Sequence, residues 1–279
     1  MPRRASSPPE AGRRRRETGA RVPVPVAVLA AVAAAFFALP LLGLLQRAAW
    51  SDVVRDLGSP EARAALRLSL ECSLWATALA TVLGVPLAWV LARGEFRGRT
   101  LLRALVLLPM VLPPVVGGVA LLYAFGRTDG LVGPWLADTL GIQLTFSKTG
   151  VVLAETFVAM PFLVLTVEGG WRALDARYED VAATLGAGRW TTFHRVTLRL
   201  LAPSLAAGAA LAWARALGEF GATITFAGNI VGRTRTTPLA VYLLLETRPG
   251  TAVALSLVLL AVSVVVLVAL RDRWFGVNR

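Results

Sequence analysis

The segment that decides the fold is YEDVAATLGAGRWTTFHRVTLRLLAPSL, residues 178–205. Its first half is charged and helix-forming and ends at Gly186, whereas its second half runs directly into an apolar stretch. Glycine at a helix end permits a sharp turn that other residues resist. A short polar helix, a turn and a long apolar run together predict a loop that lies between two hydrophobic spans.

The composition places those spans in a membrane. Hydrophobic residues make up 56% of the 279 positions, and the mean hydropathy is +0.65, which exceeds what the core of a soluble domain needs. About 20 apolar residues cross the hydrocarbon core of a bilayer, which is about 30 Å thick. Windows of about this length lie at Val22–Gln46, Cys72–Leu91, Ala104–Phe125, Gly150–Val167, Leu200–Gly218 and Thr251–Leu270. Their apolar runs are continuous rather than alternating, so we expect an all-α integral membrane protein with about six transmembrane helices and not a β-barrel.

The net charge of +12 would suit nucleic acid, but its distribution argues against that partner. Six spans put both termini on the same side, and most arginines fall on that side, whereas the opposite loops are close to neutral. The arginines of this side include Arg3, Arg4, Arg93, Arg97, Arg172, Arg177, Arg271 and Arg273. By the positive-inside rule, this side and both termini are predicted to be cytoplasmic.

Three regions follow from these patterns. Residues 1–21 are rich in Arg, Pro and Ser, which predicts a disordered cytoplasmic tail. Residues 22–271 form the predicted transmembrane domain, with a cytoplasmic loop at about 172–199, and residues 272–279 form a short cytoplasmic tail. The apolar run after the first tail is longer than that of a cleavable signal peptide.

The reactive groups of an enzyme are missing from the sequence. His194 is the single histidine and Cys72 the single cysteine, so no conventional zinc or other metal site is expected. The lone lysine, Lys148, lies in TFSKTG without the glycines of a phosphate-binding loop. We therefore expect no enzyme activity and no bound cofactor. If ATP drives the protein, a separate subunit must use the ATP and Mg²⁺.

Few charged residues fall within or beside the spans, namely Glu155, Arg215 and Glu219. Arg215 and Glu219 are four residues apart, so they share a helical face and can pair. Ionisable groups at membrane depth are costly unless they pair or face water. Both a packing pair and a substrate pathway remain open, but a single acid in the fourth span argues against a proton-coupled carrier.

Residues 218–242 concentrate glycine, threonine, asparagine and arginine between the last two spans. Their hydroxyl, amide and guanidinium donors suit a tetrahedral oxyanion, although the same residues can cap helix ends. In the third predicted span, Pro113 and Pro114 are followed by Gly117 and Gly118. Prolines bend a helix and glycines allow close packing, which predicts either a hinged helix along a pathway or a packing kink.

Residues 178–205 resemble the cytoplasmic coupling loop of ABC importer permeases. That loop has the pattern E-A-A, three residues, G, nine residues, I-x-L-P. The matching positions are Asp180, Val181, Ala182, Gly186, Val196 and Leu198. Asp180 replaces the family's Glu and Arg199 its Pro, while Glu179 lies one place earlier and Pro203 four places after Arg199. Residues 107–126 and 216–242 are similar to the molybdate type of these permeases, and sulfate and tungstate permeases share much of that pattern.

The resemblance implies the type I ABC importer permease fold and transport of molybdate by alternating access in the cytoplasmic membrane of a prokaryote. Its implied partners are a second copy of the chain, two ATPase subunits, an extracytoplasmic oxyanion-binding protein and membrane lipid. The implied ATPase-coupling residues are Glu179, Asp180, Val181, Ala182, Ala183, Gly186 and Ala187. The implied pathway and gate residues are Pro113, Pro114, Gly117, Gly118, Glu219, Phe220, Gly221, Thr223, Thr225 and Asn229. A sulfate or tungstate permease, an ATP-independent carrier or channel, and a membrane enzyme or scaffold are the alternatives.

Overall fold

The computed structural model describes residues 23–175 and 177–274, with side chains described as far as Leu270. The regular secondary structure of these residues is helical, and no strand occurs among them. The predicted tail at 1–21 and the end of the predicted tail at 272–279 lie outside them. The helices are α1 (Val24–Arg47), α2 (Val53–Leu57), α3 (Pro60–Arg93), α4 (Arg99–Val111), α5 (Pro114–Phe125), α6 (Gly133–Leu140), α7 (Lys148–Ala173), α8 (Arg177–Thr184), α9 (Arg189–Thr192), the π-helix η1 (Phe193–Thr197), α10 (Leu198–Leu217), α11 (Gly221–Phe226), α12 (Thr237–Thr247) and α13 (Pro249–Trp274).

The chain divides into two units, residues 1–46 and 47–279. The described part of the first unit is helix α1, which has 24 residues, is apolar up to Gln46 and contains no buried residue. At about 1.5 Å per residue it is long enough to cross a bilayer. The predicted first span is therefore confirmed from Val24 onward.

Five stretches of the described chain are long and apolar enough to cross a membrane, and together with the shorter apolar helices they give the predicted all-helical membrane fold. They are Val24–Arg47, Pro60–Arg93, Lys148–Ala173, Arg189–Leu217 and Pro249–Leu270. The sixth predicted span, over 104–125, consists of two helices and not of one, because α4 ends at Val111 and α5 begins at Pro114.

The prolines explain why this span breaks rather than bends. Leu112 and Pro113 each precede a proline, a position that disfavours helical backbone angles. Both are extended, with ψ of 136° at Leu112 and 131° at Pro113. The 12 residues of α5 rise only about 18 Å, too little to cross the hydrocarbon core unaided.

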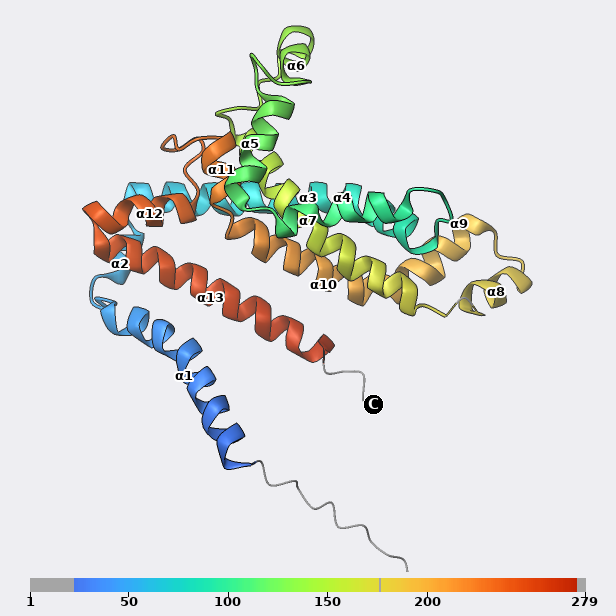
Figure 1. The fold of residues 1–279 in the computed structure, drawn as a ribbon, viewed down its shortest axis with the longest axis horizontal. Coiled ribbons are helices and arrows are strands. Elements are labelled where there is room, and N and C mark those ends of the chain that lie inside the picture. Colours follow the sequence, from blue (N-terminus) through green and yellow to red (C-terminus); the bar gives the residue numbers. More distant parts are fainter. Residues whose placement is uncertain (1–22, 176, 275–279) are drawn as a thin grey trace, which may run out of the picture. The chain divides into compact units, whose positions relative to one another are not determined.

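Helix α7 forms the centre of the second unit, packed against α3 on one side and α10 on another (Figure 1). Small residues let these helices approach closely: a Cβ built at Gly84 of α3 would lie 2.9 Å from Leu163 Cδ2, and Gly208 of α10 faces the Leu163 carbonyl. Leu163 is fully buried in the main apolar cluster. Such close contacts are the usual way in which membrane helices associate.

Residues 218–242 contain the short helix α11, a loop and the first half of α12. Pro238 occupies the first turn of α12, where its missing N–H costs nothing, and Thr236 precedes the helix with extended backbone angles. Helix α12 packs against α3 and α13. Thr236 stands at the N-cap position, but its hydroxyl makes no capping hydrogen bond within the described chain, so the capping role that the sequence allowed is not seen at the start of α12.

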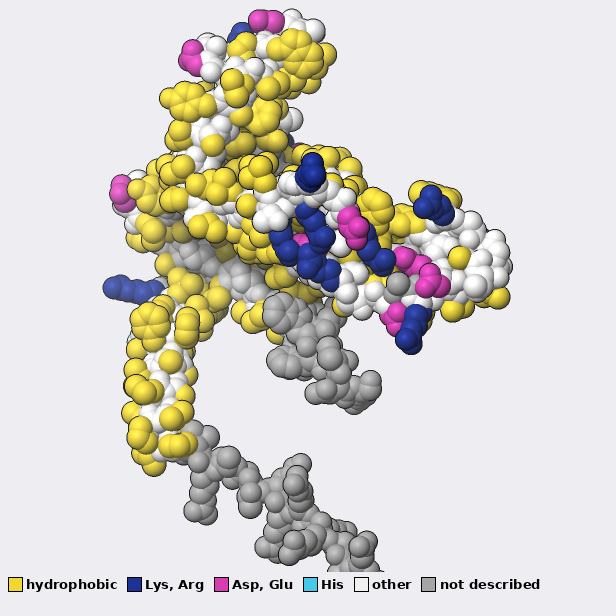
Figure 2. All heavy atoms as spheres, turned by 45° about the vertical axis from the view of Figure 1, so that its right-hand side comes forward, with side chains coloured by type: hydrophobic (Ala, Val, Ile, Leu, Met, Phe, Trp, Pro, Cys, Tyr) yellow, Lys and Arg dark blue, Asp and Glu magenta, His cyan; other side chains and the backbone are white. Residues whose placement is uncertain are grey.

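The two ends of this bundle differ in character. Helices α2 and α12 lie at one end and helices α8 and α9 at the other (Figure 1). Lysine and arginine side chains gather beside acidic ones toward the α8 and α9 end, whereas the flanks are mainly hydrophobic (Figure 2). An apolar flank beside a charged end is the surface expected of a chain embedded in lipid.

Candidate coupling surface and membrane gate

Helix α8 is a separate short helix, as residues 178–187 predicted, and its sequence explains both ends. Glu179 and Asp180 lie in the first turn, where negative charge is favourable. At the other end Gly186 has φ +81°. The Gly186 N–H donates to the Ala183 carbonyl and the Ala187 N–H to the Ala182 carbonyl, both at 3.0 Å. This is a Schellman motif, and it confirms that Gly186 ends the helix.

The outer surface of α8 is apolar. Tyr178, Val181 and Leu185, which are spaced for one helical face, expose 56%, 57% and 82% of their surface. Trp190, just after the turn, is also exposed. Asp180, Ala183 and Gly186 lie exposed beside them. Four large apolar side chains close together on a polar end of the protein mark a surface that a partner can cover.

Two residues predicted to lie on this exposed surface do not lie there. Ala182 is buried, and Glu179 turns toward its own chain. Helical geometry accounts for Glu179, which lies about 160° around the helix axis from Val181. Ala182 lies closer to the outer face and is nevertheless buried. Ala187 is partly exposed, and its N–H closes the helix end.

A second acid, Glu168, organises the same end of the bundle. Its carboxylate is almost fully buried and lies 2.8 Å from Arg172 Nη2 and 3.1 Å from Arg103 Nη2. Arg172 belongs to the same helix as Glu168, whereas Arg103 belongs to α4. Two arginines on one carboxylate offset the cost of burying it and fasten α4 to α7.

The predicted gate residues from the third span and from 218–226 meet in one contact between α5 and α11. A Cβ at Gly118 would lie 2.6 Å from Thr225 Cβ and 2.9 Å from the Ala222 carbonyl oxygen. A Cβ at Gly221 would lie 2.7 Å from Pro114 Cβ. Gly117, in turn, lies against the Phe157 ring of α7. The paired glycines therefore join α5 closely to α11 and α7.

The predicted pairing of Arg215 with Glu219 is confirmed. Arg215 Nη1 lies 2.8 Å from Glu219 Oε2, an ion pair whose geometry is not that of a hydrogen bond. The other carboxylate oxygen accepts the Ala222 N–H at 2.9 Å. The buried Glu219 carboxylate thus neutralises Arg215 with one oxygen and anchors the start of α11 with the other.

The remaining predicted gate residues have different surroundings. Thr223 is fully buried, and its hydroxyl has no hydrogen-bond partner in the described part of the chain. The Thr225 hydroxyl donates to the Gly221 carbonyl within its own helix. Phe220 lies 5.3 Å from Tyr242, centroid to centroid, and Pro113 is exposed at the break before α5. The structure therefore places the two threonine hydroxyls inside packed contacts.

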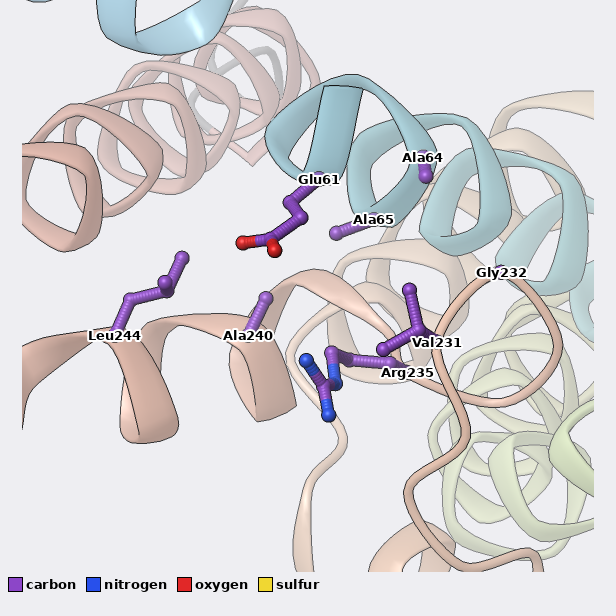
Figure 3. Close-up of a pocket in the computed structure, with 8 residues that line it drawn as sticks. All are labelled: Glu61, Ala64, Ala65, Val231, Gly232, Arg235, Ala240 and Leu244. Atoms are coloured by element: carbon purple, nitrogen blue, oxygen red, sulfur yellow. The ribbon is translucent and has the colours of Figure 1, made fainter. Parts of the chain in front are cut away.

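Asn229 lies apart from that contact, in the loop before α12. Its Oδ1 accepts a hydrogen bond of 2.8 Å from Arg235 Nε. Arg235 and Glu61 line a small cavity between α3, this loop and α12 (Figure 3). The cavity has about 10 Å³ of space for the centre of a water, enough for about one water molecule. A tetrahedral oxyanion does not fit there.

Glu155, in the first third of α7, is also buried. Its Oε2 finds no hydrogen-bond partner among the residues that the structure describes. Within those residues, no group of three or more His, Cys, Asp or Glu side chains could hold a metal ion. Of the buried acids, Glu168 and Glu219 therefore form ion pairs, and Glu219 also holds a helix end, whereas Glu155 has an oxygen without a partner among the described residues.

Several residues of these sites were not identified from sequence. Glu168 could have been found, because Arg172 follows it by four residues, but its second partner Arg103 lies on another helix. The exposure of Leu185 could have been predicted from helical spacing, because Leu185 shares a face of α8 with Tyr178 and Val181. No local signal indicated that Arg93 and Thr197 would lie beside Glu179.

Comparisons with known proteins agree with this arrangement. Residues 80–277 match the family model described as "Binding-protein-dependent transport system inner membrane component". The chain is 49% identical over 238 residues to the "Molybdenum transport system permease protein ModB" of Mycobacterium tuberculosis, covering 85% of this chain and 89% of that protein. It is 39% identical over 233 residues to the "Sulfate transport system permease protein CysT" of Escherichia coli, covering 82% and 83%.

The fold has a solved counterpart. A chain of a bacterial alginate ABC transporter, crystallised with its alginate-bound periplasmic protein, superposes with a TM-score of 0.69 over 88% of this chain and 92% of that one, at 18% identity. The fold is therefore that of an ABC importer permease. The chain belongs to the family of binding-protein-dependent transport system inner membrane components, as a multi-pass permease subunit of the bacterial inner membrane whose ATPase is a separate subunit.

Proposed function

We propose that this chain is the permease subunit of a molybdate importer. The observation that carries this proposal is the 49% identity to ModB of M. tuberculosis, which extends over 85% of the chain. The likeness includes the α5 and α11 region, where the predicted pathway residues lie. In this proposal two copies of the chain form the pathway, two ATPase subunits drive it, and an extracytoplasmic binding protein delivers the anion.

Sulfate is the second candidate substrate, because the CysT relative is 39% identical over 82% of the chain. Tungstate is a third, since it nearly equals molybdate in size and charge. Selection among these anions belongs to the binding protein in this scheme. A permease that bound the anion tightly would slow its own release.

The charges of the described spans fit that scheme. Arg215 is paired with Glu219 and so offers little net positive charge to hold an anion. Glu155 is buried in the fourth predicted span. We infer that the pathway is close to neutral and that the anion passes along backbone and side-chain dipoles when α5 and α11 move apart from their counterparts in the second copy.

Helix α8 is the proposed contact with the ATPase. Its apolar outer face, formed by Tyr178, Val181 and Leu185, lies at the charged end of the bundle. The positive-inside rule makes that end cytoplasmic, where an ATPase is located, and puts both chain termini on the same side. Closure of two ATPases around ATP would then move both α8 helices and favour one orientation of the spans.

The break between α4 and α5 is the proposed hinge. Leu112 and Pro113 have extended backbones, so α5 can rotate without breaking helical hydrogen bonds. The tight contact of Gly118 and Gly221 with neighbouring residues makes α11 move together with α5. The pair would act as one rigid gate element.

The substrate is tested by competition. Liposomes holding this chain, its ATPase and its binding protein are supplied with ATP inside and with molybdate outside, and uptake is measured in the presence of excess sulfate or tungstate. Uptake that resists sulfate and falls with tungstate supports the proposal. Uptake that sulfate abolishes, with sulfate itself transported, would instead assign the chain to a sulfate importer.

A further inference from the structure

Glu179 bridges three elements of its own chain. Its Oε1 accepts a hydrogen bond of 3.0 Å from the Thr197 hydroxyl, which belongs to the π-helix η1. Its Oε2 lies 3.5 Å from Arg93 Nη1, in the last turn of α3. Glu179 itself lies in the first turn of α8. One carboxylate therefore connects α8 with α3 and with the start of the α10 span.

The helix termini favour this arrangement of charges. An acid is stabilised in the first turn of a helix and a base in the last turn, because the helix dipole is positive at its start and negative at its end. Glu179 and Arg93 occupy these two positions and face each other. The pair is thus supported by both helices as well as by the attraction between the two side chains.

The other anchor is firmly packed. Thr197 is buried, and its hydroxyl also lies 3.4 Å from the Thr192 carbonyl oxygen. Phe193, in the same π-turn, lies between two tryptophans: its ring centroid is 6.3 Å from that of Trp171 and 5.9 Å from that of Trp190. Trp171 belongs to α7. Single π-turns within helices are rare and occur often at functional sites.

We propose that Glu179 is a positioning residue that transmits the movement of α8 to α3 and α10 and does not itself bind the ATPase. The proposal rests on the function given above, in which α8 receives that movement from the ATPase. Val181 and Leu185 form the contact with the ATPase on the outer face, and Glu179, Arg93 and Thr197 form the connection to the spans on the inner face. The two faces of one short helix thus have separate roles.

This division makes the residues separable by experiment. The Arg93 and Glu179 side chains are 33% and 30% exposed, and ion pairs of this kind add little to the stability of a fold. Glu179→Gln removes the charge but keeps an oxygen that can accept the Thr197 hydroxyl. Arg93→Gln removes the opposite charge. Both variants should therefore insert in the membrane and assemble normally.

The test compares three variants, Glu179→Gln, Arg93→Gln and the double variant, in the assembled complex. Two quantities are measured: capture of the ATPase on purification, and substrate transported per ATP hydrolysed in liposomes. We expect normal capture and a transport ratio that is lower by roughly 2- to 30-fold, the range seen when coupling elements are altered. Because both single variants break the same link, the double variant should be no worse than either one.

The reversed pair, Arg93→Glu with Glu179→Arg, should recover part of the ratio. The matched control is Glu95→Gln. Glu95 is an exposed acid just beyond α3, without a hydrogen bond or ion pair to any residue that the structure describes, so its removal should change neither quantity.

Two results would overturn the proposal. Loss of ATPase capture in Glu179→Gln but not in Arg93→Gln would mean that Glu179 touches the ATPase directly. A normal transport ratio in all three variants would mean that the link transmits nothing. Val181→Asp distinguishes failure of this proposal from failure of the proposed function. If Val181→Asp abolishes ATPase capture while Glu179→Gln behaves as wild type, only the transmitting role of Glu179 is wrong. If the ATPase is still captured by Val181→Asp, the proposed docking of α8 on the ATPase is wrong.

Discussion

Gly118 of α5 lies directly against Thr225 of α11, so that a Cβ at position 118 would lie only 2.6 Å from the Thr225 Cβ. The Ala222 carbonyl oxygen and Cα close the same space at 2.9 Å and 3.1 Å. Since two of these three neighbours are backbone atoms, they cannot rotate away as a side chain could. The contact makes α5 and α11 a single packed element at the proposed gate.

Gly118→Ala should therefore force the two helices apart. Extra methyl groups in a packed interior typically cost about 1–3 kcal/mol, and we expect a lower melting temperature in detergent and slower uptake. Gly169→Ala is the matched control, because Gly169 is an exposed glycine within helix α7 and a Cβ there would meet no atom within 4 Å. Equal melting temperatures and equal uptake for the two variants would contradict the tight contact.

Glu219→Gln should destabilise the protein by about 3 kcal/mol, the lower end of the cost of removing one partner of a buried ion pair. The lower end applies because the Arg215 side chain is 29% exposed. The amide oxygen can still accept the Ala222 N–H, so the loss would report the ion pair. We expect the double variant Arg215→Gln with Glu219→Gln to be more stable than Glu219→Gln alone, as measured by thermal unfolding. A double variant that is less stable than the single one would contradict this account.

Glu168→Gln should loosen α4 from α7. The buried carboxylate accepts hydrogen bonds from Arg172 of its own helix and forms an ion pair with Arg103 of α4. Removing one partner of a buried ion pair typically costs about 3–5 kcal/mol. We expect faster amide hydrogen exchange in α4 and a lower unfolding temperature. Glu95→Gln, which removes an exposed acid near α4, should leave both unchanged. Unaltered exchange in α4 after Glu168→Gln would show that the apolar contacts alone hold the helix.

Gly186→Val should disturb the end of α8 because Gly186 has φ +81°. A left-handed backbone costs roughly 1–2 kcal/mol for a residue with a Cβ, and a β-branched side chain tolerates it least. Gly186→Asn should be milder, since asparagine adopts this conformation more readily. The measurement is molybdate uptake at equal amounts of assembled complex. Equal losses in both variants would point to the added bulk and not to the backbone.

The sequence predicted the elements that depend on composition and local order. The long apolar runs gave the spans around α1, α3, α7, α10 and α13, and Gly186 correctly marked the end of α8. The i,i+4 spacing correctly paired Arg215 with Glu219. Each of these features is decided within a few turns of one helix.

The features that were missed depend on contacts between distant segments or on several neighbours acting together. Two consecutive prolines end α4 completely, although a single proline in a membrane helix often only bends it. Glu179 was expected on the docking surface because it lies beside the family motif, but Arg93 and Thr197 draw it inward. Sequence spacing along one helix cannot reveal partners on other helices, whether they lie 18 residues away, as Thr197 does, or much farther along the chain, as Arg93 does.

The measurement that tests the central claim most directly compares molybdate uptake by liposomes in three states: with this chain alone, with the full complex of chain, ATPase and binding protein plus ATP, and with the full complex carrying Val181→Asp. The account predicts uptake only in the second state, since transport requires the ATPase and a docked α8. ATP-independent uptake by the chain alone would contradict it and would make the protein a carrier or channel.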